Sequence, residues 1–123
     1  MFETLSERSS MMSKVKEVNL EYGSPVVDIA VKNMINQLGT CKKQGYKAVI
    51  LVHGYGSSGT GGVIKAAVRS KLREPSLSGM VKSYCGGEHW FEKKKELLSI
   101  CGSLSDYQRR IDGNQGVTVV ILK

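Results

Sequence analysis

This 123-residue chain has few cysteines and no long apolar run. No apolar stretch approaches the roughly 20 residues that a membrane-spanning helix needs, and the polar N-terminus shows no secretory signal. Its three cysteines, Cys41, Cys85 and Cys101, are far apart and odd in number, which argues against a disulfide framework. Together with His89, two of them could ligate zinc, but no fourth ligand is suitably spaced. We therefore expect a cytoplasmic protein with no membrane partner.

Acidic residues are nearly absent from the middle of the chain. Between Lys32 and Lys82 there are nine Lys or Arg residues and a single acid, Glu74, so this window has a net charge of +8. The whole chain carries only +7. Such a basic block favours a polyanionic partner, DNA or RNA, although a solvated basic surface is the alternative.

The pattern of apolar residues predicts one α/β domain over residues 15–123, after a flexible arm over residues 1–14. A polar excursion over residues 86–115 contains two weakly helical stretches, which indicates either short helices or a mobile flap. The order β-α-β-α-β-insertion-β implies a two-layer sandwich with helices on a sheet. Strands are expected at 15–21, 48–52, 80–85 and 116–122, and helices at 25–43, 63–73, 90–100 and 105–111.

A glycine-rich loop connects the buried strand 48–52 to the second helix. Five of the ten residues 53–62 are glycine, which lets the backbone approach another surface closely. Free N–H groups at the helix start, with Lys65 and Arg69 nearby, favour contact with a phosphate or carboxylate. The alternative is a connector whose glycines serve only turns. A dinucleotide fingerprint at Gly54, Gly56 and Gly59 is weak, because the chain is too short for that fold.

His53 ends the buried strand where open α/β sheets bind their ligands. Its imidazole is a candidate general base or phosphate contact, and the alternative is a structural histidine bonded to the loop backbone. Tyr55, within the loop, could stack on a base or could simply pack.

These residues resemble the Smr (small MutS-related) domain family. His53-Gly54-Tyr55-Gly56 matches the HGxG motif of the family, and a Thr-Gly pair and a similar basic helix follow at residues 60–61 and 65–72. The closing residues 116–120 resemble the Gly-Ala-Thr-Val-Val strand of the family. The resemblance covers residues 15–123. It implies a β-α-β-α-β-β sandwich with a mixed four-stranded sheet, similar to the C-terminal domain of translation initiation factor three.

The resemblance also implies binding of DNA or RNA at the HGxG loop, and several family members nick or cleave nucleic acid. The family usually has Leu-Asp-x-His-Gly at the end of the first strand. Here Tyr22 precedes Gly23, and Asn19 or Leu20 stands near the aspartate position. Neither Asn19 nor Tyr22 is a good base near neutral pH, and strand alternation places Glu21 on the face opposite Tyr22.

We therefore predict a nucleic-acid-binding domain with weak or no nuclease activity and no cofactor. The alternatives are a nicking endonuclease that uses His53 with a divalent metal, and a nucleotide or protein interaction module. A protein partner would contact the 86–115 excursion. The predicted nucleic-acid contacts are Gly54, Tyr55, Gly56, Gly59, Thr60, Lys65, Arg69 and Arg73, with Lys42, Lys43 and Lys82 extending the same surface.

Overall fold

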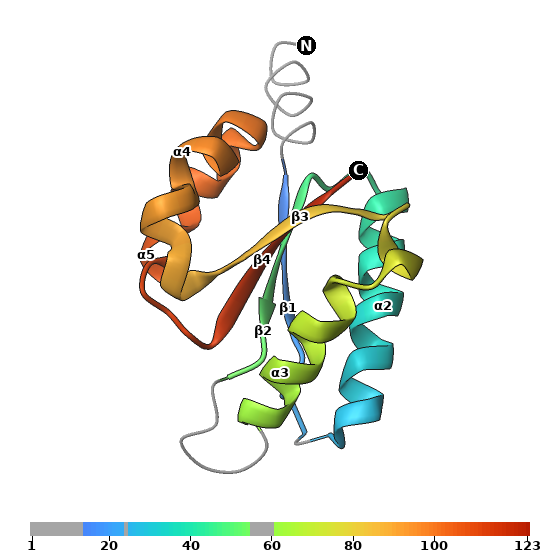
Figure 1. Cartoon of the computed structure of the whole chain (residues 1–123). Helices are drawn as coiled ribbons and strands as arrows, with labels where there is room; N and C mark the ends of the chain where they lie inside the picture. Colours follow the sequence, from blue (N-terminus) through green and yellow to red (C-terminus); the bar gives the residue numbers. More distant parts are fainter. Residues whose placement is uncertain (1–13, 24, 55–60) are drawn as a thin grey trace.

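A mixed four-stranded sheet of order β1-β2-β4-β3 forms the centre of the computed structural model (Figure 1). The model describes residues 14–23, 25–54 and 61–123. β1 and β2 are parallel, while β4 is antiparallel to both β2 and β3. These pairings confirm the predicted sheet. The strands are β1 (Val15–Asn19), β2 (Ala48–Val52), β3 (Val81–Gly86) and β4 (Val117–Leu122).

The sheet has two ends that differ in chemistry. At one end, which we call the loop end, β1, β2 and β3 finish and β4 begins. The glycine-rich segment starts from this end, directly after Val52. At the opposite end β1, β2 and β3 begin and β4 finishes, so Lys14, Lys47 and Lys123 flank it.

Two helices, α2 (Val27–Lys43) and α3 (Gly61–Leu72), cover one face of the sheet (Figure 1). The apolar residues of α2 recur every three or four positions, so one stripe of the helix is buried against the sheet. The N-cap of α2 is Val26, in an extended conformation, so the predicted start at Pro25 is two residues too early. The buried side chains of this layer include Ala30, Met34, Leu38, Ile64 and Val68, which pack on Val49, Leu51 and Val120.

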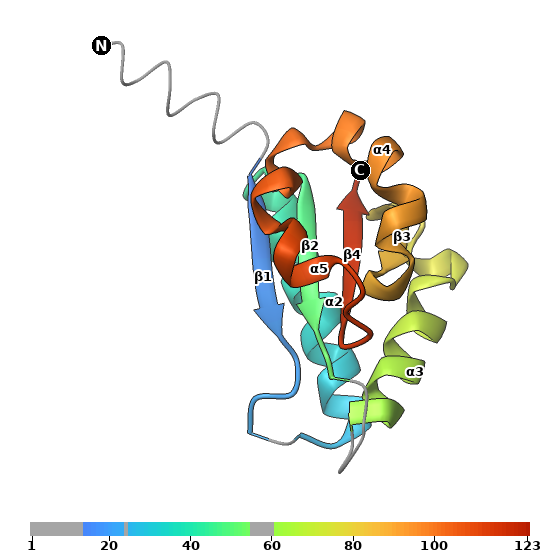
Figure 2. The same ribbon diagram turned by 90° about the vertical axis from the view of Figure 1, so that its left-hand side faces the viewer.

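The inserted segment forms a second helical layer on the other face of the sheet (Figure 2). It comprises the short helix η2 (Gly87–His89), α4 (Trp90–Ile100), η3 (Gly102–Tyr107) and α5 (Gln108–Ile111). Of the two predictions for the excursion, short helices are therefore confirmed. Trp90 is fully buried in this layer, which packs on Ile50 and Val119. β2 and β4 are thus covered on both faces, which explains why nearly all of their residues are apolar and buried.

The first strand ends earlier than its apolar pattern predicts. β1 stops at Asn19, whose side-chain Oδ1 accepts a hydrogen bond from the backbone N–H of Glu21 at 2.9 Å. This side-chain bond turns the chain, so strand alternation does not govern the directions of Glu21 and Tyr22. No helix in the described part of the chain is long and apolar enough to cross a membrane.

Because Trp90 lies at the centre of the second layer, Trp90→Ala should lower the free energy of unfolding by about 3–5 kcal/mol. Denaturant unfolding followed by far-ultraviolet circular dichroism measures this change. The matched control is Phe91→Ala, one residue along α4, whose side chain is 73% exposed. The control should change stability by less than about 0.5 kcal/mol. Equal, small effects of both variants would show that the insertion does not contribute to the cooperative core.

Candidate nucleic-acid interface

His53 is fully buried at the loop end of the sheet. The backbone N–H groups of His53 and Gly54 both donate to the carbonyl oxygen of Gly116, at 2.9 and 3.0 Å. The imidazole Nδ1 lies 2.7 Å from the carbonyl oxygen of Gly54, and Nε2 lies 2.8 Å from Oγ1 of Thr118. A carbonyl can only accept, so Nδ1 carries the proton and Nε2 accepts from Thr118.

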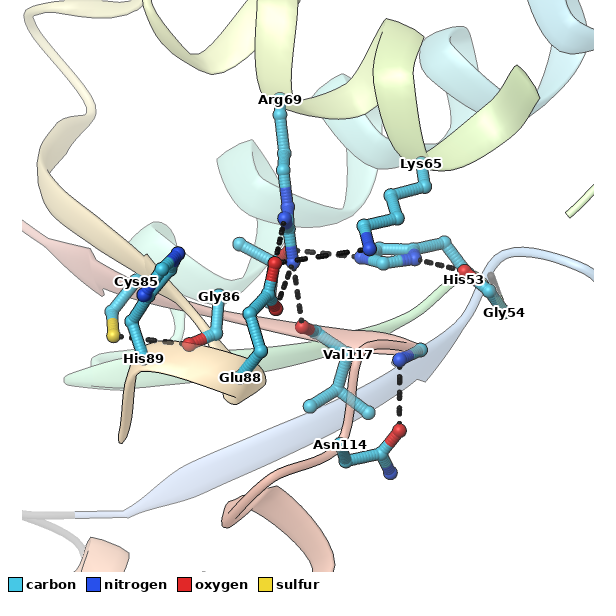
Figure 3. Close-up of polar contacts among 12 residues, drawn as sticks. His53, Gly54, Lys65, Arg69, Cys85, Gly86, Glu88, His89, Asn114 and Val117 are labelled. Atoms are coloured by element: carbon cyan, nitrogen blue, oxygen red, sulfur yellow. Dashed lines mark hydrogen bonds and ion pairs between the residues drawn. The ribbon is translucent and has the colours of Figure 1, made fainter. Parts of the chain in front are cut away.

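A chain of hydrogen bonds leads from His53 to the helix α3. Arg69 Nε donates to Thr118 Oγ1 at 3.1 Å, which leaves the hydroxyl proton of Thr118 free to bond His53 Nε2. The two terminal nitrogens of Arg69 donate to the carboxylate of Glu88 at 2.6 and 2.9 Å. Figure 3 shows the Arg69 side chain reaching down from α3 to this carboxylate, with His53 and Lys65 beside it. This hydrogen-bond chain therefore joins β4, α3 and η2 to His53, the residue that directly follows β2.

Burial and nearby charges fix the protonation states of His53 and Glu88 in this hydrogen-bond chain. Burial, aided by the nearby positive charges of Arg69 and Lys65, lowers the pKa of His53 to about 4. Hydrogen bonds from Arg69 are the main reason that the pKa of Glu88 is lowered to about 2. At neutral pH the imidazole of His53 is therefore neutral and the carboxylate of Glu88 is ionised.

Glycine is required at two positions around the site. Gly54 has a left-handed φ of +76°, and the carboxylate of Glu21 occupies the space that a Cβ would need. Gly87 lies so close to the backbone carbonyls of Ile111 and Asn114 that a side chain cannot fit. The contact at Gly54 brings the Glu21 carboxylate beside the start of the glycine-rich loop. The close packing of Gly87 places the next residue, Glu88, against Arg69.

The Lys65–Arg69 pair already binds an oxyanion from within the chain. Besides its two bonds to Arg69, the Glu88 carboxylate lies 3.7 Å from the ammonium of Lys65. The Lys65 and Arg69 side chains are each 19% exposed and that of Glu88 is 24% exposed, so all three remain in contact with solvent. A bidentate carboxylate on a guanidinium has the same fork geometry that arginine uses for phosphate.

The structure brings together only part of the predicted surface. The loop end contains four of the predicted residues, His53, Gly54, Lys65 and Arg69. Arg73 is exposed, but it follows the last residue of α3 and so lies at the end of that helix away from the loop. Four predicted loop contacts, Tyr55, Gly56, Gly59 and Thr60, lie outside the described residues. Lys42 and Lys43 are in the last turn of α2 and Lys82 is near the start of β3, so they lie at the other end of the sheet.

Sequence reasoning missed Glu88 and Thr118. A signal existed for Thr118, which is the one hydroxyl residue in the apolar strand β4 and is fully buried. No pattern pointed to Glu88, because an isolated acid in a polar segment resembles any surface residue. Among residues 14–23, 25–54 and 61–123, no three His, Cys, Asp or Glu side chains are grouped closely enough to hold a metal ion.

Comparison with known proteins identifies relatives of this architecture. The family model described as the Smr domain matches residues 26–94. Among solved structures, the crystal structure of the Smr domain of Thermus thermophilus MutS2 is similar, with 25% sequence identity and a TM-score of 0.56. The match covers 88% of this chain and 98% of that one. No curated protein matches the chain. The matched family segment contains His53, Lys65, Arg69 and Glu88 but not β4 with Thr118.

The low pKa of His53 predicts a specific dependence of stability on pH. The unfolded histidine, with a pKa of 6.5, binds a proton more readily than the buried one at about 4. Stability should therefore fall as the pH drops from 6.5 to 4, by at most about 3 kcal/mol. Imidazole nitrogen chemical shifts should show a neutral Nδ1–H ring at pH 6. A His53 ring that is half protonated near pH 6.5 would contradict this.

Thr118→Val should lower the free energy of unfolding by about 1–3 kcal/mol, because it leaves a buried imidazole nitrogen without its donor. Thr118→Ser retains the hydroxyl and is the matched control. Urea unfolding of both variants separates the lost hydrogen bonds from changes in packing. Equal destabilisation by Ser and Val would mean that the hydroxyl does not link Arg69 to His53.

Proposed function

We propose, because the chain belongs to the Smr domain family, that it binds DNA or RNA by contacting the phosphate backbone at the loop end of its sheet. The crystal structure that it resembles is described as the Smr domain of a MutS2 protein, and membership of the family supports interaction with nucleic acid. Residues of the loop end that the structure describes supply the proposed contacts, chiefly Lys65 and Arg69.

The observation that carries this proposal is the Glu88 carboxylate between Lys65 and Arg69. A pair of cations that holds one oxyanion in bidentate geometry can hold another of similar shape, and phosphate is such an oxyanion. Phosphate from a nucleic acid would compete with Glu88 for the terminal nitrogens of Arg69. The bond from Arg69 Nε to Thr118 would still hold the guanidinium in place.

The start of α3 supports the same ligand. α3 begins at Gly61, directly after the segment 55–60, and its first-turn N–H groups and dipole favour an anion. The first turn contains no acidic residue. Lys65 follows one turn later on the same helix, so the proposed phosphate contacts lie close together.

We expect weak or no nuclease activity. His53 is buried and both ring nitrogens are engaged, so it would have to break its bond to Thr118 before it could accept a proton from water. In this proposal His53 is a positioning residue that shapes the Gly54 turn. Nicking of supercoiled plasmid that disappears in a His53→Asn variant with unchanged DNA affinity would contradict this and favour the endonuclease alternative.

Competition by Glu88 predicts that Glu88→Gln should strengthen binding to nucleic acid. Removing the carboxylate frees Lys65 and Arg69, and we expect affinity to rise about fivefold or more, equivalent to ~1 kcal/mol. Fluorescence anisotropy with a labelled 20-nucleotide strand, at several salt concentrations, measures the affinity. In the wild-type protein the affinity should fall steeply as salt rises.

The matched control is Glu92→Gln, which removes the same charge from an exposed residue of α4. A purely long-range effect of net charge would raise affinity equally in both variants. No increase with Glu88→Gln, or an affinity of the wild-type protein that does not depend on salt, would overturn the proposed phosphate site. Binding of mononucleotides but not of oligonucleotides would favour the nucleotide-binding alternative.

A further inference from the structure

Every strand of the sheet carries a lysine at the end opposite the loop. Backbone hydrogen bonds hold these positions side by side: Lys47 donates to the carbonyl of Lys14 at 3.1 Å, and Leu122 donates to that of Lys47 at 3.0 Å. Lys123 donates to the carbonyl of Met80 at 3.0 Å, beside the start of β3. Neighbouring strands lie about 4.8 Å apart, so the lysines form a row about 15 Å long.

The last turn of α2 extends this row. It supplies Lys42 and Lys43, which are both exposed. The chain then passes through Tyr46 into β2, and the ammonium group of Lys14 lies 4.2 Å from the centre of the Tyr46 ring. The ammonium of Lys16 lies 6.0 Å from the same ring. We call these residues the lysine end: Lys14, Lys16, Lys42, Lys43, Lys47, Lys82 and Lys123.

The charges of the lysine end are uncompensated within the part of the chain that the structure describes. No ion pair among those residues joins any of the seven lysines to a carboxylate. Six of them are exposed, and Lys14 is partly buried. Glu17, in the middle of β1, forms an ion pair with Arg110 of the second layer at 2.8 Å. At the loop end, in contrast, Glu88 offsets part of the charge of Lys65 and Arg69.

We propose that the lysine end is a second nucleic-acid-binding surface, which contacts phosphates and does not read bases. Seven lysines and no described carboxylate partner favour a polyanion. Lys14 covers one face of the Tyr46 ring, and the ring also packs against the core, so it is not offered for base stacking. The inference rests on the proposed function only for its choice of nucleic acid as the polyanion.

The two surfaces are too far apart to form one short site. α2 begins near the loop end and finishes at the lysine end (Figure 1), and its 17 residues span about 26 Å. A tetranucleotide with stacked bases extends about 14 Å at 3.4 Å per nucleotide, roughly half the length of α2, so it is too short to contact both surfaces. One domain would therefore hold two segments of nucleic acid, or two distant parts of one long strand.

The test is a nuclear magnetic resonance titration of the whole chain with a tetranucleotide of deoxyadenosine, whose bases stack, at low salt. The inference predicts saturable shifts of the Lys47, Lys82 and Lys123 amides, separate from those of Gly54 and Lys65. Shifts at the loop end alone would overturn this inference and leave the proposed function standing. Shifts at the lysine end alone would support it and overturn the proposed loop contact.

A triple variant, Lys47→Gln with Lys82→Gln and Lys123→Gln, tests the same surface by affinity. For a 20-nucleotide strand, the slope of log K against log salt should become shallower by about two units. The matched control, Lys94→Gln with Lys95→Gln and Arg109→Gln, removes equal charge from the second helical layer and should change the slope by less than one unit. Equal changes in both would overturn the inference, as would binding through this surface to phosphatidylserine vesicles but not to the oligonucleotide.

Discussion

The hydrogen-bond chain from Gly54 through His53, Thr118 and Arg69 to Glu88 is the constraint on which the loop end depends. Arg69 donates in both directions, to Glu88 and to Thr118, and burial keeps the imidazole of His53 neutral, so each bond from Thr118 through His53 to Gly54 has a fixed donor and acceptor. It fixes the turn from which the glycine-rich loop begins and aims the terminal nitrogens of Arg69 at an oxyanion. His53, the histidine of the HGxG motif, thus supports the backbone at the start of the loop.

The inserted segment gives this chain properties that a bare β-α-β-α-β-β sandwich would lack. It covers the second face of the sheet with Trp90 at the centre of a separate core, and it places Glu88 against Lys65 and Arg69. Structure and site are therefore coupled, because the packing of Gly87 that closes the second layer also positions the carboxylate. Under the proposed function the Glu88 carboxylate is an internal competitor, and the insertion would then set how readily the loop end accepts phosphate.

Much of the fold could be predicted from sequence, because the apolar periodicity of α2 and the continuous run 48–52 have few other interpretations. The candidate site was harder to predict from sequence than the fold. Lys65 and Arg69 were found from their spacing on one helix, but the partner of Arg69 came from a polar segment without a pattern. Lys42, Lys43 and Lys82 lie in the same basic window of sequence as the loop, yet α2 carries the first two away from it. Charge counted along a chain does not give its distribution in space.

The most direct test of the central claim is to observe the side-chain nitrogens of Arg69 by nuclear magnetic resonance while a short oligonucleotide is added. If phosphate replaces Glu88, the terminal nitrogen signals of Arg69 should shift saturably, while its Nε signal, bonded to Thr118, stays in place. If the Nε and terminal signals are unchanged at saturation, the bound phosphate does not reach Arg69 and the account of the loop end is wrong.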